Sequence, residues 1–122
     1  MAKILIIEDE KDIRQLITFT LQYAGYQVVA GKDGQEAVDL VQQEMPDLIL
    51  MDVRMPRLDG YAACRIIKAD EKTKHIPVAF LSAKGQDAEI EKGFEVGASE
   101  YLLKPFTHTE LIDRVKTLLA GG

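Results

Sequence analysis

One stretch decides the fold: Asp47-Leu48-Ile49-Leu50-Met51-Asp52, followed by Val53-Arg54-Met55-Pro56. Residues 48–51 form an unbroken apolar run of strand length, which is typical of a central strand covered on both faces. The run ends in the carboxylate of Asp52, and Pro56 then marks a loop. The sequence therefore predicts a buried strand with an acidic side chain at its carboxyl end.

Three further apolar runs end in polar side chains, as the central run does. The runs and the residues that follow them are 4–7 with Glu8 and Asp9, 78–81 with Ser82, and 101–103 with Lys104. If these runs are parallel strands, their carboxyl ends share one edge of a sheet, which is where open α/β folds bind ligands. The sequence thus predicts an edge that carries three carboxylates, a hydroxyl and an ammonium group.

Short strand-like runs alternate with longer amphipathic runs along the chain. Strands are expected at residues 3–7, 26–30, 48–51, 78–81 and 99–103. Helices are expected at residues 12–23, 35–44, 60–69, 87–96 and 108–118. Because strand and helix alternate five times, we expect a parallel sheet with right-handed crossovers and helices on both faces. The run at 26–30 is the most polar strand, so it is expected at an edge.

Caps and apolar faces can be assigned to several of these helices. Three helices have a favoured N-cap residue, namely Asp33, Asp59 and Thr107. Side chains expected to face the core include Ile13, Leu16, Ile17 and Leu21 in the first helix and Ala63, Ile66 and Ile67 in the third. Phe19 points away from the first of these faces, which leaves a docking surface and partial burial against a loop as alternatives.

Composition restricts the kind of protein. The 122 residues favour one domain, residues 1–122, and the net charge of −5 disfavours DNA or an anionic membrane as a direct partner. No apolar run approaches the roughly 18–20 residues that span a bilayer. The strand that starts at Lys3 leaves no room for a signal peptide, and a single cysteine fits a reducing compartment. A cytoplasmic location is therefore expected.

The acidic side chains at the predicted edge would repel one another. Two like charges about 4 Å apart cost roughly 4 kcal/mol at an effective dielectric near 20, so Glu8, Asp9 and Asp52 call for a cation. Ligands that are all oxygens suit Mg²⁺, which completes its shell with water and phosphate oxygens. Lys104 and Ser82 could bind a phosphoryl group, and Asp52 could attack phosphorus to form an acyl phosphate.

Each of these residues also has a structural explanation. Asp9 alone is a favoured helix N-cap, and Asp52 alone could be a turn residue. Ser82 alone could be a loop hydroxyl, and Lys104 alone a solvated surface lysine. The four together, each at the end of a separate element, favour a site over four unrelated structural roles.

At this point the sequence closely resembles a known family, the receiver domain of bacterial two-component response regulators. The matching segments are Ile6–Glu10, Met51–Pro56 with Asp59 and Gly60, Leu81–Ala83, and Tyr101–Phe106. The resemblance covers about residues 3–119 and implies a flavodoxin-like doubly wound (βα)5 fold with sheet order 2-1-3-4-5. Each matching segment alone is weak evidence for the family, but all of them in this order are highly specific.

The resemblance also implies a role for each site residue. Asp52 is expected to be the phosphoacceptor, with Ser82 and Lys104 binding the phosphoryl group. Glu8, Asp9, Asp52 and the main-chain carbonyl of Arg54 are expected to hold Mg²⁺, Glu8 mainly through water. Tyr101 is expected to turn inward when Ser82 moves toward the phosphate, although packing alone could also explain this aromatic residue. The Lys104–Pro105 peptide bond is expected to be cis.

The expected partners follow from the same resemblance. A sensor histidine kinase or a histidine phosphotransfer protein would donate the phosphoryl group. An output domain or effector would bind the face formed by the fourth helix, fifth strand and fifth helix, and a phosphorylation-dependent dimer is a further expectation. The domain would catalyse only its own phosphorylation and dephosphorylation.

Two other classes of protein fit less well. A Mg²⁺-dependent phosphatase with an aspartyl intermediate usually has a second acid two residues after the nucleophile, where this chain has Arg54. A flavin carrier needs a first loop that offers hydroxyls and glycine to phosphate, and here that loop is acidic.

Overall fold

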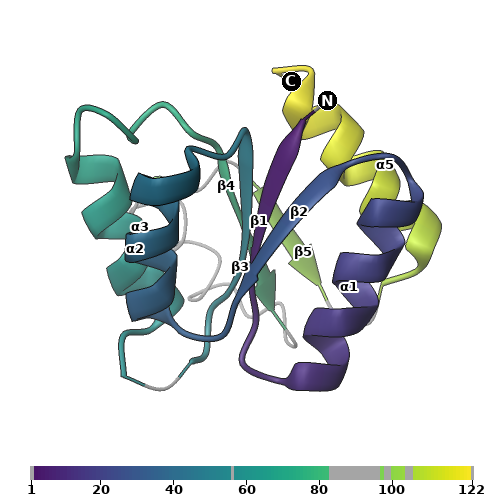
Figure 1. The fold of residues 1–122 in the computed structure, drawn as a ribbon, viewed down its shortest axis with the longest axis horizontal. Helices are drawn as coiled ribbons and strands as arrows, with labels where there is room; N and C mark the ends of the chain where they lie inside the picture. Colours follow the sequence, from purple (N-terminus) through teal and green to yellow (C-terminus); the bar gives the residue numbers. More distant parts are fainter. Residues whose placement is uncertain (1, 56, 83–96, 98–99, 104–105, 122) are drawn as a thin grey trace.

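A parallel five-stranded sheet runs through the middle of the protein, in the order β2-β1-β3-β4-β5 (Figure 1). The structure is a computed structural model that describes residues 2–55, 57–82, 97, 100–103 and 106–121. The strands are β1 (Lys3–Ile7), β2 (Gln27–Gly31), β3 (Leu48–Asp52), β4 (Val78–Ser82) and β5 (Glu100–Leu103). The predicted flavodoxin-like fold and strand order are confirmed, and the polar strand β2 lies at an edge as expected.

Helices cover both faces of this sheet (Figure 1). The described helices are α1 (Lys11–Tyr23), α2 (Gly34–Glu44), α3 (Gly60–Ala69) and α5 (His108–Leu119). The pair α1 and α5 covers one face, and the pair α2 and α3 lies on the other. The helix predicted at residues 87–96 lies outside the described residues. None of the described helices is long and apolar enough to cross a bilayer.

The strand register brings the carboxyl ends of the three central strands together. Ile7 of β1 pairs with Met51 of β3, and Asp52 pairs with Leu81 of β4. The chain continues from these positions into Glu8 and Ser82, so the predicted site residues follow neighbouring strands at one edge. That edge lies at the bottom of Figure 1, opposite the chain termini.

Two core-facing predictions are wrong. Leu16 is 54% exposed and Ile66 is 46% exposed. In α1 the buried positions are Ile17, Thr20 and Leu21, so Leu16 lies on the flank of the buried stripe rather than within it. Ile66 likewise flanks the buried stripe of α3, which is made by Gly60, Tyr61, Ala63, Cys64 and Ile67. Helical spacing of apolar side chains therefore predicted a wider buried face than either helix has.

The three predicted helix caps are confirmed, and the start of α1 shows that Asp9 is not a fourth cap. Asp33 accepts a hydrogen bond from the Glu36 amide, Asp59 accepts one from the Ala62 amide, and Thr107 forms a capping box with Glu110. In α1 the N-cap residue is Glu10, without a side-chain cap bond. Asp9 therefore does not serve as a helix cap.

Candidate functional site

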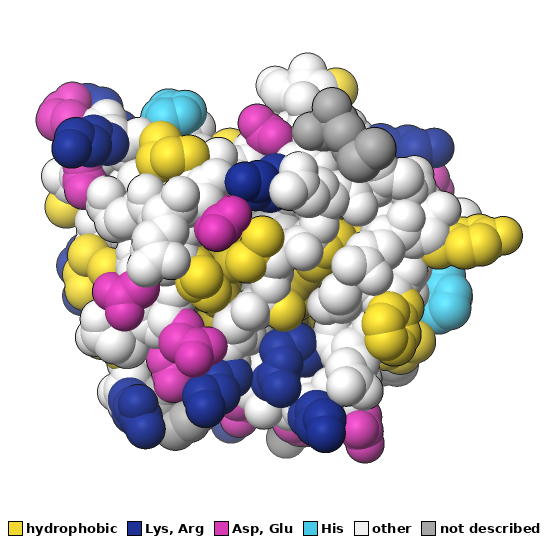
Figure 2. Space-filling model, in the orientation of Figure 1, with side chains coloured by type: hydrophobic (Ala, Val, Ile, Leu, Met, Phe, Trp, Pro, Cys, Tyr) yellow, Lys and Arg dark blue, Asp and Glu magenta, His cyan; other side chains and the backbone are white. Residues whose placement is uncertain are grey.

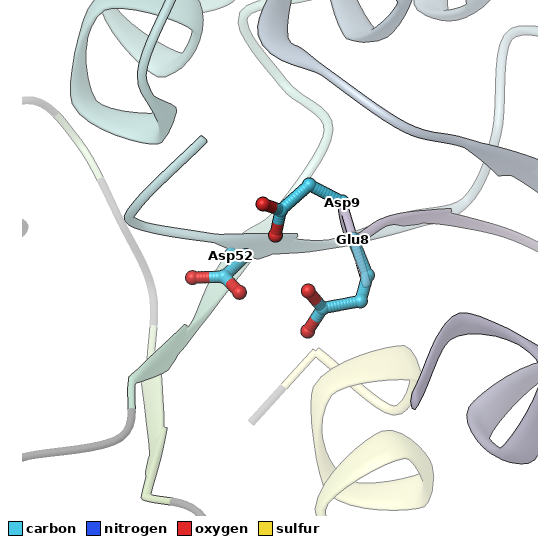
Figure 3. Close-up of side chains that lie close together, drawn as sticks. All are labelled: Glu8, Asp9 and Asp52. Carbon is cyan, nitrogen blue, oxygen red and sulfur yellow. The ribbon is translucent and has the colours of Figure 1, made fainter. Parts of the chain in front are cut away.

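Three carboxylates meet at the carboxyl edge of the sheet. Glu8 and Asp9 follow β1, Asp52 ends β3, and their side chains point toward one another (Figure 3). One carboxylate oxygen from each residue lies within 4.8 Å of the others. Glu8 and Asp52 are buried, whereas Asp9 is exposed to solvent. The predicted convergence of these acids is therefore present, with one open side.

Main-chain hydrogen bonds fix the two buried acids. The Glu8 amide donates to the Gly31 carbonyl at 3.1 Å, which extends the β1–β2 pairing by one residue. The Glu10 amide donates to Glu8 Oε2 at 3.2 Å. The Arg54 amide donates to Asp52 Oδ1 at 3.0 Å, so the turn after β3 orients the Asp52 carboxylate. These bonds hold two like charges close together before any ligand binds.

Arg14 belongs to this site, although no motif in the sequence pointed to it. Its Nη1 donates to the main-chain oxygens of Glu8 at 2.8 Å and Asp9 at 3.4 Å. Long side chains in the first turns of a helix lean back toward its amino terminus, and that direction could have indicated the contact. The guanidinium ties α1 to the acidic loop and places a permanent positive charge against the backbone of that loop.

The start of α3 is packed directly on the backbone of the central acid. The Gly60 amide donates to the Val53 carbonyl at 2.9 Å. A β-carbon at Gly60 would lie 2.3 Å from the main-chain oxygen of Asp52, closer than any van der Waals contact allows. Glycine is therefore needed here for the close approach of two backbones.

Of the two predicted phosphoryl-binding residues, Ser82 lies on the next strand of the sheet. Ser82 is the last residue of β4, is 4% exposed, and pairs with Leu103 of β5. Lys104 follows Leu103 and, like Pro105, lies outside the described residues. Arg54 is exposed at the rim of the site, directly after the loop leaves β3.

Tyr101 is buried on the α2–α3 side of the sheet. Its ring lies 5.6 Å from the Phe80 ring, centroid to centroid, and Phe80 lies 5.2 Å from the Tyr61 ring. The hydroxyl oxygens of Tyr61 and Tyr101 are 2.6 Å apart, which is a hydrogen bond. The resemblance to receiver domains pointed to Tyr101 but not to Tyr61, because nothing in the sequence pairs two residues that lie forty positions apart.

The donor set of the acidic cluster fits a hard divalent cation. All three side-chain ligands are carboxylates, and among the described residues no other group of three His, Cys, Asp or Glu side chains is placed to share an ion. Oxygen ligands with one solvent-open side suit Mg²⁺, which retains several water ligands. The repulsion among the carboxylates gives such an ion a further reason to bind.

Known proteins share both this sequence pattern and this fold. The DNA-binding dual master transcriptional regulator RpaA of Synechocystis is 42% identical over 119 residues, which are 98% of this chain and 49% of that protein. The chain spans about half the length, 45–49%, of the curated relatives that it matches.

Solved structures agree with this likeness. The chemotaxis response regulator CheY4 of Vibrio cholerae has a TM-score of 0.92 and 33% identity, over 97% of this chain and 98% of that one. The receiver domain of the sensor histidine kinase PA1611 from Pseudomonas aeruginosa has a TM-score of 0.91 and 34% identity, over 98% of both chains. That structure contains a magnesium ion coordinated in its active site cleft.

The sequence also matches a family as a whole, over residues 4–116. This range takes in nearly all of the strands and helices described above, as well as the three converging carboxylates and Ser82. The chain therefore belongs to the response regulator receiver domain family, the regulatory domains of two-component signalling.

Proposed function

We propose that Asp52 is the phosphoacceptor of this receiver domain. The observation that carries the proposal is the convergence of Asp52 with Glu8 and Asp9, three carboxylate oxygens within 4.8 Å at the end of a central strand. The Asp52 carboxylate is held by the Arg54 amide, so its orientation is set before the phosphodonor arrives.

Mg²⁺ would be held by Glu8, Asp9, Asp52 and the main-chain carbonyl of Arg54, with Glu8 acting mainly through water. When bound, the ion neutralises charge on the carboxylates and on the phosphoryl oxygens. The chain's own residues do the rest. An Asp52 oxygen attacks phosphorus, a P–O bond forms, and the bond from phosphorus to the donor histidine nitrogen breaks. Ser82 and Lys104 bind the phosphoryl oxygens as the group moves.

The test is phosphorylation by acetyl phosphate, followed by intact-mass measurement with Mg²⁺ and with EDTA. We expect one phosphoryl group in Mg²⁺, none in EDTA, and none in Asp52→Asn. The matched control is Asp47→Asn, which changes the aspartate just before the other end of the same strand. A modification that persists in Asp52→Asn or forms normally in EDTA contradicts the proposal.

An apolar groove on the α1–α5 side of the sheet is proposed to dock the phosphodonor. It is a hollow of about 460 Å³ between α1 and α5, lined by Leu16, Phe19, Thr20, Tyr23, His108 and Ile112. Figure 2 shows hydrophobic side chains next to a histidine at the right-hand edge, over the region of α1. Helix α1 starts two residues after Asp9, so a kinase or phosphotransfer protein seated here would contact the helix that leads away from the acidic loop.

This surface can be separated from the chemistry. Phe19→Ala should slow transfer from the donor protein and leave the rate with acetyl phosphate unchanged, because Phe19 is 63% exposed and not part of the acidic cluster. Ile66→Ala is the control, since Ile66 is 46% exposed on the other face of the sheet. Equal rates of phosphoryl transfer from the donor protein to Phe19→Ala and Ile66→Ala would show that the donor does not dock on this groove.

The output of the domain is proposed to involve Ser82, Tyr101 and the β5–α5 surface. A phosphoryl group adds acceptor oxygens that Ser82 can bond, and the Tyr101 ring responds to movement of Ser82. The receiving partner is an output domain, an effector or a second copy of this domain. One relative is named as a DNA-binding regulator, and with a net charge of −5 this domain is not the DNA-contacting part. A cytoplasmic location completes the proposal.

A further inference from the structure

Tyr61 and Tyr101 form a buried pair that crosses from a helix to a strand. Tyr61 is in the first turn of α3 and Tyr101 is in β5, and they are 6% and 8% exposed. Their hydroxyl oxygens are 2.6 Å apart, a short distance for an O–H to O hydrogen bond. Phe80 packs edge-on against Tyr61 and at a tilt against Tyr101, so both rings also share an apolar neighbour.

The helix end that carries Tyr61 is in contact with the backbone of Asp52. Gly60, the residue before Tyr61, donates its amide to Val53 and has no room for a β-carbon against the Asp52 carbonyl. Backbone contacts of this kind cannot be relieved by rotating a side chain. A displacement of the Asp52 backbone therefore reaches Tyr61 through one residue, and reaches Tyr101 through one further hydrogen bond.

We propose that Tyr61 is a positioning residue for Tyr101: its hydroxyl holds the Tyr101 ring buried before Asp52 is phosphorylated, and the start of α3 ties that hydroxyl to the phosphoacceptor strand. This inference rests on the proposed role of Asp52. It adds a second route between site and ring, beside the one through Ser82. The buried ring is thus a populated state of the resting domain, and phosphorylation increases a population that already exists.

The effect of removing the Tyr61 hydroxyl follows from hydrogen-bond energetics. Tyr61→Phe deprives the buried Tyr101 hydroxyl of this partner, and water can serve that hydroxyl when the ring moves outward. A hydrogen bond between neutral groups changes such an equilibrium by roughly two- to tenfold. We therefore expect the ratio of buried to exposed Tyr101 ring to fall roughly two- to tenfold in the unphosphorylated variant.

The experiment measures the ring directly. Tyrosine ring signals are assigned by NMR, and the access of a neutral soluble relaxation agent to the Tyr101 ring protons is compared in wild type and Tyr61→Phe without phosphate. Tyr23→Phe is the matched control, because it removes a hydroxyl from a side chain that is 94% exposed. We expect greater access in Tyr61→Phe and no change in Tyr23→Phe.

A double-mutant cycle provides a second measure of the same contact. Unfolding free energies of Tyr61→Phe, Tyr101→Phe and the double variant should be non-additive, since both single changes remove one shared bond. If a variant fails to fold, the wild type still decides: the Tyr61 and Tyr101 hydroxyl protons should exchange with water more slowly than that of Tyr23. Unchanged ring access, an additive cycle, or equally fast hydroxyl exchange overturns the inference.

The same series separates this inference from the proposed function. If wild type takes no phosphate from acetyl phosphate, the role of Asp52 is wrong, but the resting measurements above still decide whether Tyr61 holds Tyr101. If Asp52 is phosphorylated normally while Tyr61→Phe leaves ring access unchanged, the proposed function stands and the role of Tyr61 is overturned.

Discussion

Arg14 donates a hydrogen bond of 2.8 Å from its guanidinium to the main-chain oxygen of Glu8. The Arg14 side chain of helix α1 therefore fixes the loop that carries Glu8 and Asp9, two of the three acids. The bond links the local structure of α1 to the chemistry of the site, because it sets the direction of the loop and supplies a positive charge. That charge lies against the backbone of the loop whether or not a metal ion is bound.

The first prediction is that Arg14→Gln destabilises the metal-free protein by about 1.5–3 kcal/mol, the usual range for a hydrogen bond from a charged donor. Arg14→Lys should lose less, because it retains the charge and one donor. Urea unfolding in EDTA measures both. The control is Arg65→Gln, since Arg65 is exposed on α3. Equal losses in Arg14→Gln and Arg65→Gln would show that the contact contributes nothing.

Removing one of the clustered charges should have the opposite effect. Asp52→Asn is expected to raise the metal-free unfolding free energy by about 1–3 kcal/mol, because it relieves repulsion from Glu8 and Asp9 and its amide oxygen can still accept from Arg54. Mg²⁺ should stabilise the wild type by mass action and the variant much less. Thermal unfolding with and without Mg²⁺ tests this, and a variant less stable than wild type in EDTA contradicts it.

The close approach of Gly60 to Asp52 predicts a backbone effect. Gly60→Ala should cost about 2–3 kcal/mol, because its β-carbon would lie 2.3 Å from a main-chain oxygen that no rotamer change can move. It should also slow phosphorylation by displacing Asp52. Gly25→Ala is the comparison: Gly25 has φ +101° and open space around it, so strain alone applies, about 1–2 kcal/mol. Equal unfolding free energies and equal phosphorylation rates in the two variants would contradict a specific role for Gly60.

The alternating pattern of the sequence was sufficient to predict the sheet. Three apolar runs end at Glu8, Asp52 and Ser82. Because the carboxyl ends of parallel strands lie at one edge of a sheet, these runs predicted that the three residues share that edge. Helix caps were equally predictable, since Asp33, Asp59 and Thr107 act through local hydrogen bonds within three residues.

Other features depend on tertiary structure. Leu16 was predicted to be buried because helical periodicity marks a face and not the few positions that the neighbouring elements cover. The contact of Arg14 requires the loop after β1 to fold back over the helix start. The bond between Tyr61 and Tyr101 requires α3 and β5 to meet, and neither residue's local sequence encodes that meeting.

Burial of Cys64 gives a prediction for alkaline pH. Desolvation raises the pKa of the Cys64 thiol from 9.0 to about 11. Between these values the unfolded chain loses the thiol proton and the folded protein keeps it, so the unfolding free energy falls as pH rises. The contribution is fully present below pH 9, and its loss amounts to about 2–3 kcal/mol by pH 11.

Comparison with Cys64→Ala isolates this effect from the titration of lysine and tyrosine side chains. Urea unfolding of both proteins at about pH 8 and about pH 10.5 should show their stability difference shift toward the variant at the higher pH. A difference that stays constant across this range would mean that the thiol titrates equally in the folded and unfolded states.

The lifetime of the phosphorylated state is the last prediction, and it concerns Arg54. Hydrolysis needs a water molecule in line with the breaking bond, opposite Asp52. Arg54 is exposed two residues after Asp52, and its amide is held on Asp52 Oδ1, so its side chain starts at the rim of the site. A guanidinium offers only donors, so it cannot accept a hydrogen bond from that water or deprotonate it, and it can shield the phosphoryl oxygens.

Arg54→Asn should therefore shorten the lifetime of the phosphorylated protein severalfold, because an amide oxygen can accept a hydrogen bond from the attacking water. The measurement is loss of phosphate from the pre-phosphorylated protein in excess Mg²⁺. Arg57→Asn is the matched control from the same loop: Arg57 has φ 68°, which asparagine tolerates, and its side chain is 76% exposed. A rate in Arg54→Asn that equals the control or falls below it would show that Arg54 does not limit access of water to the phosphoryl group.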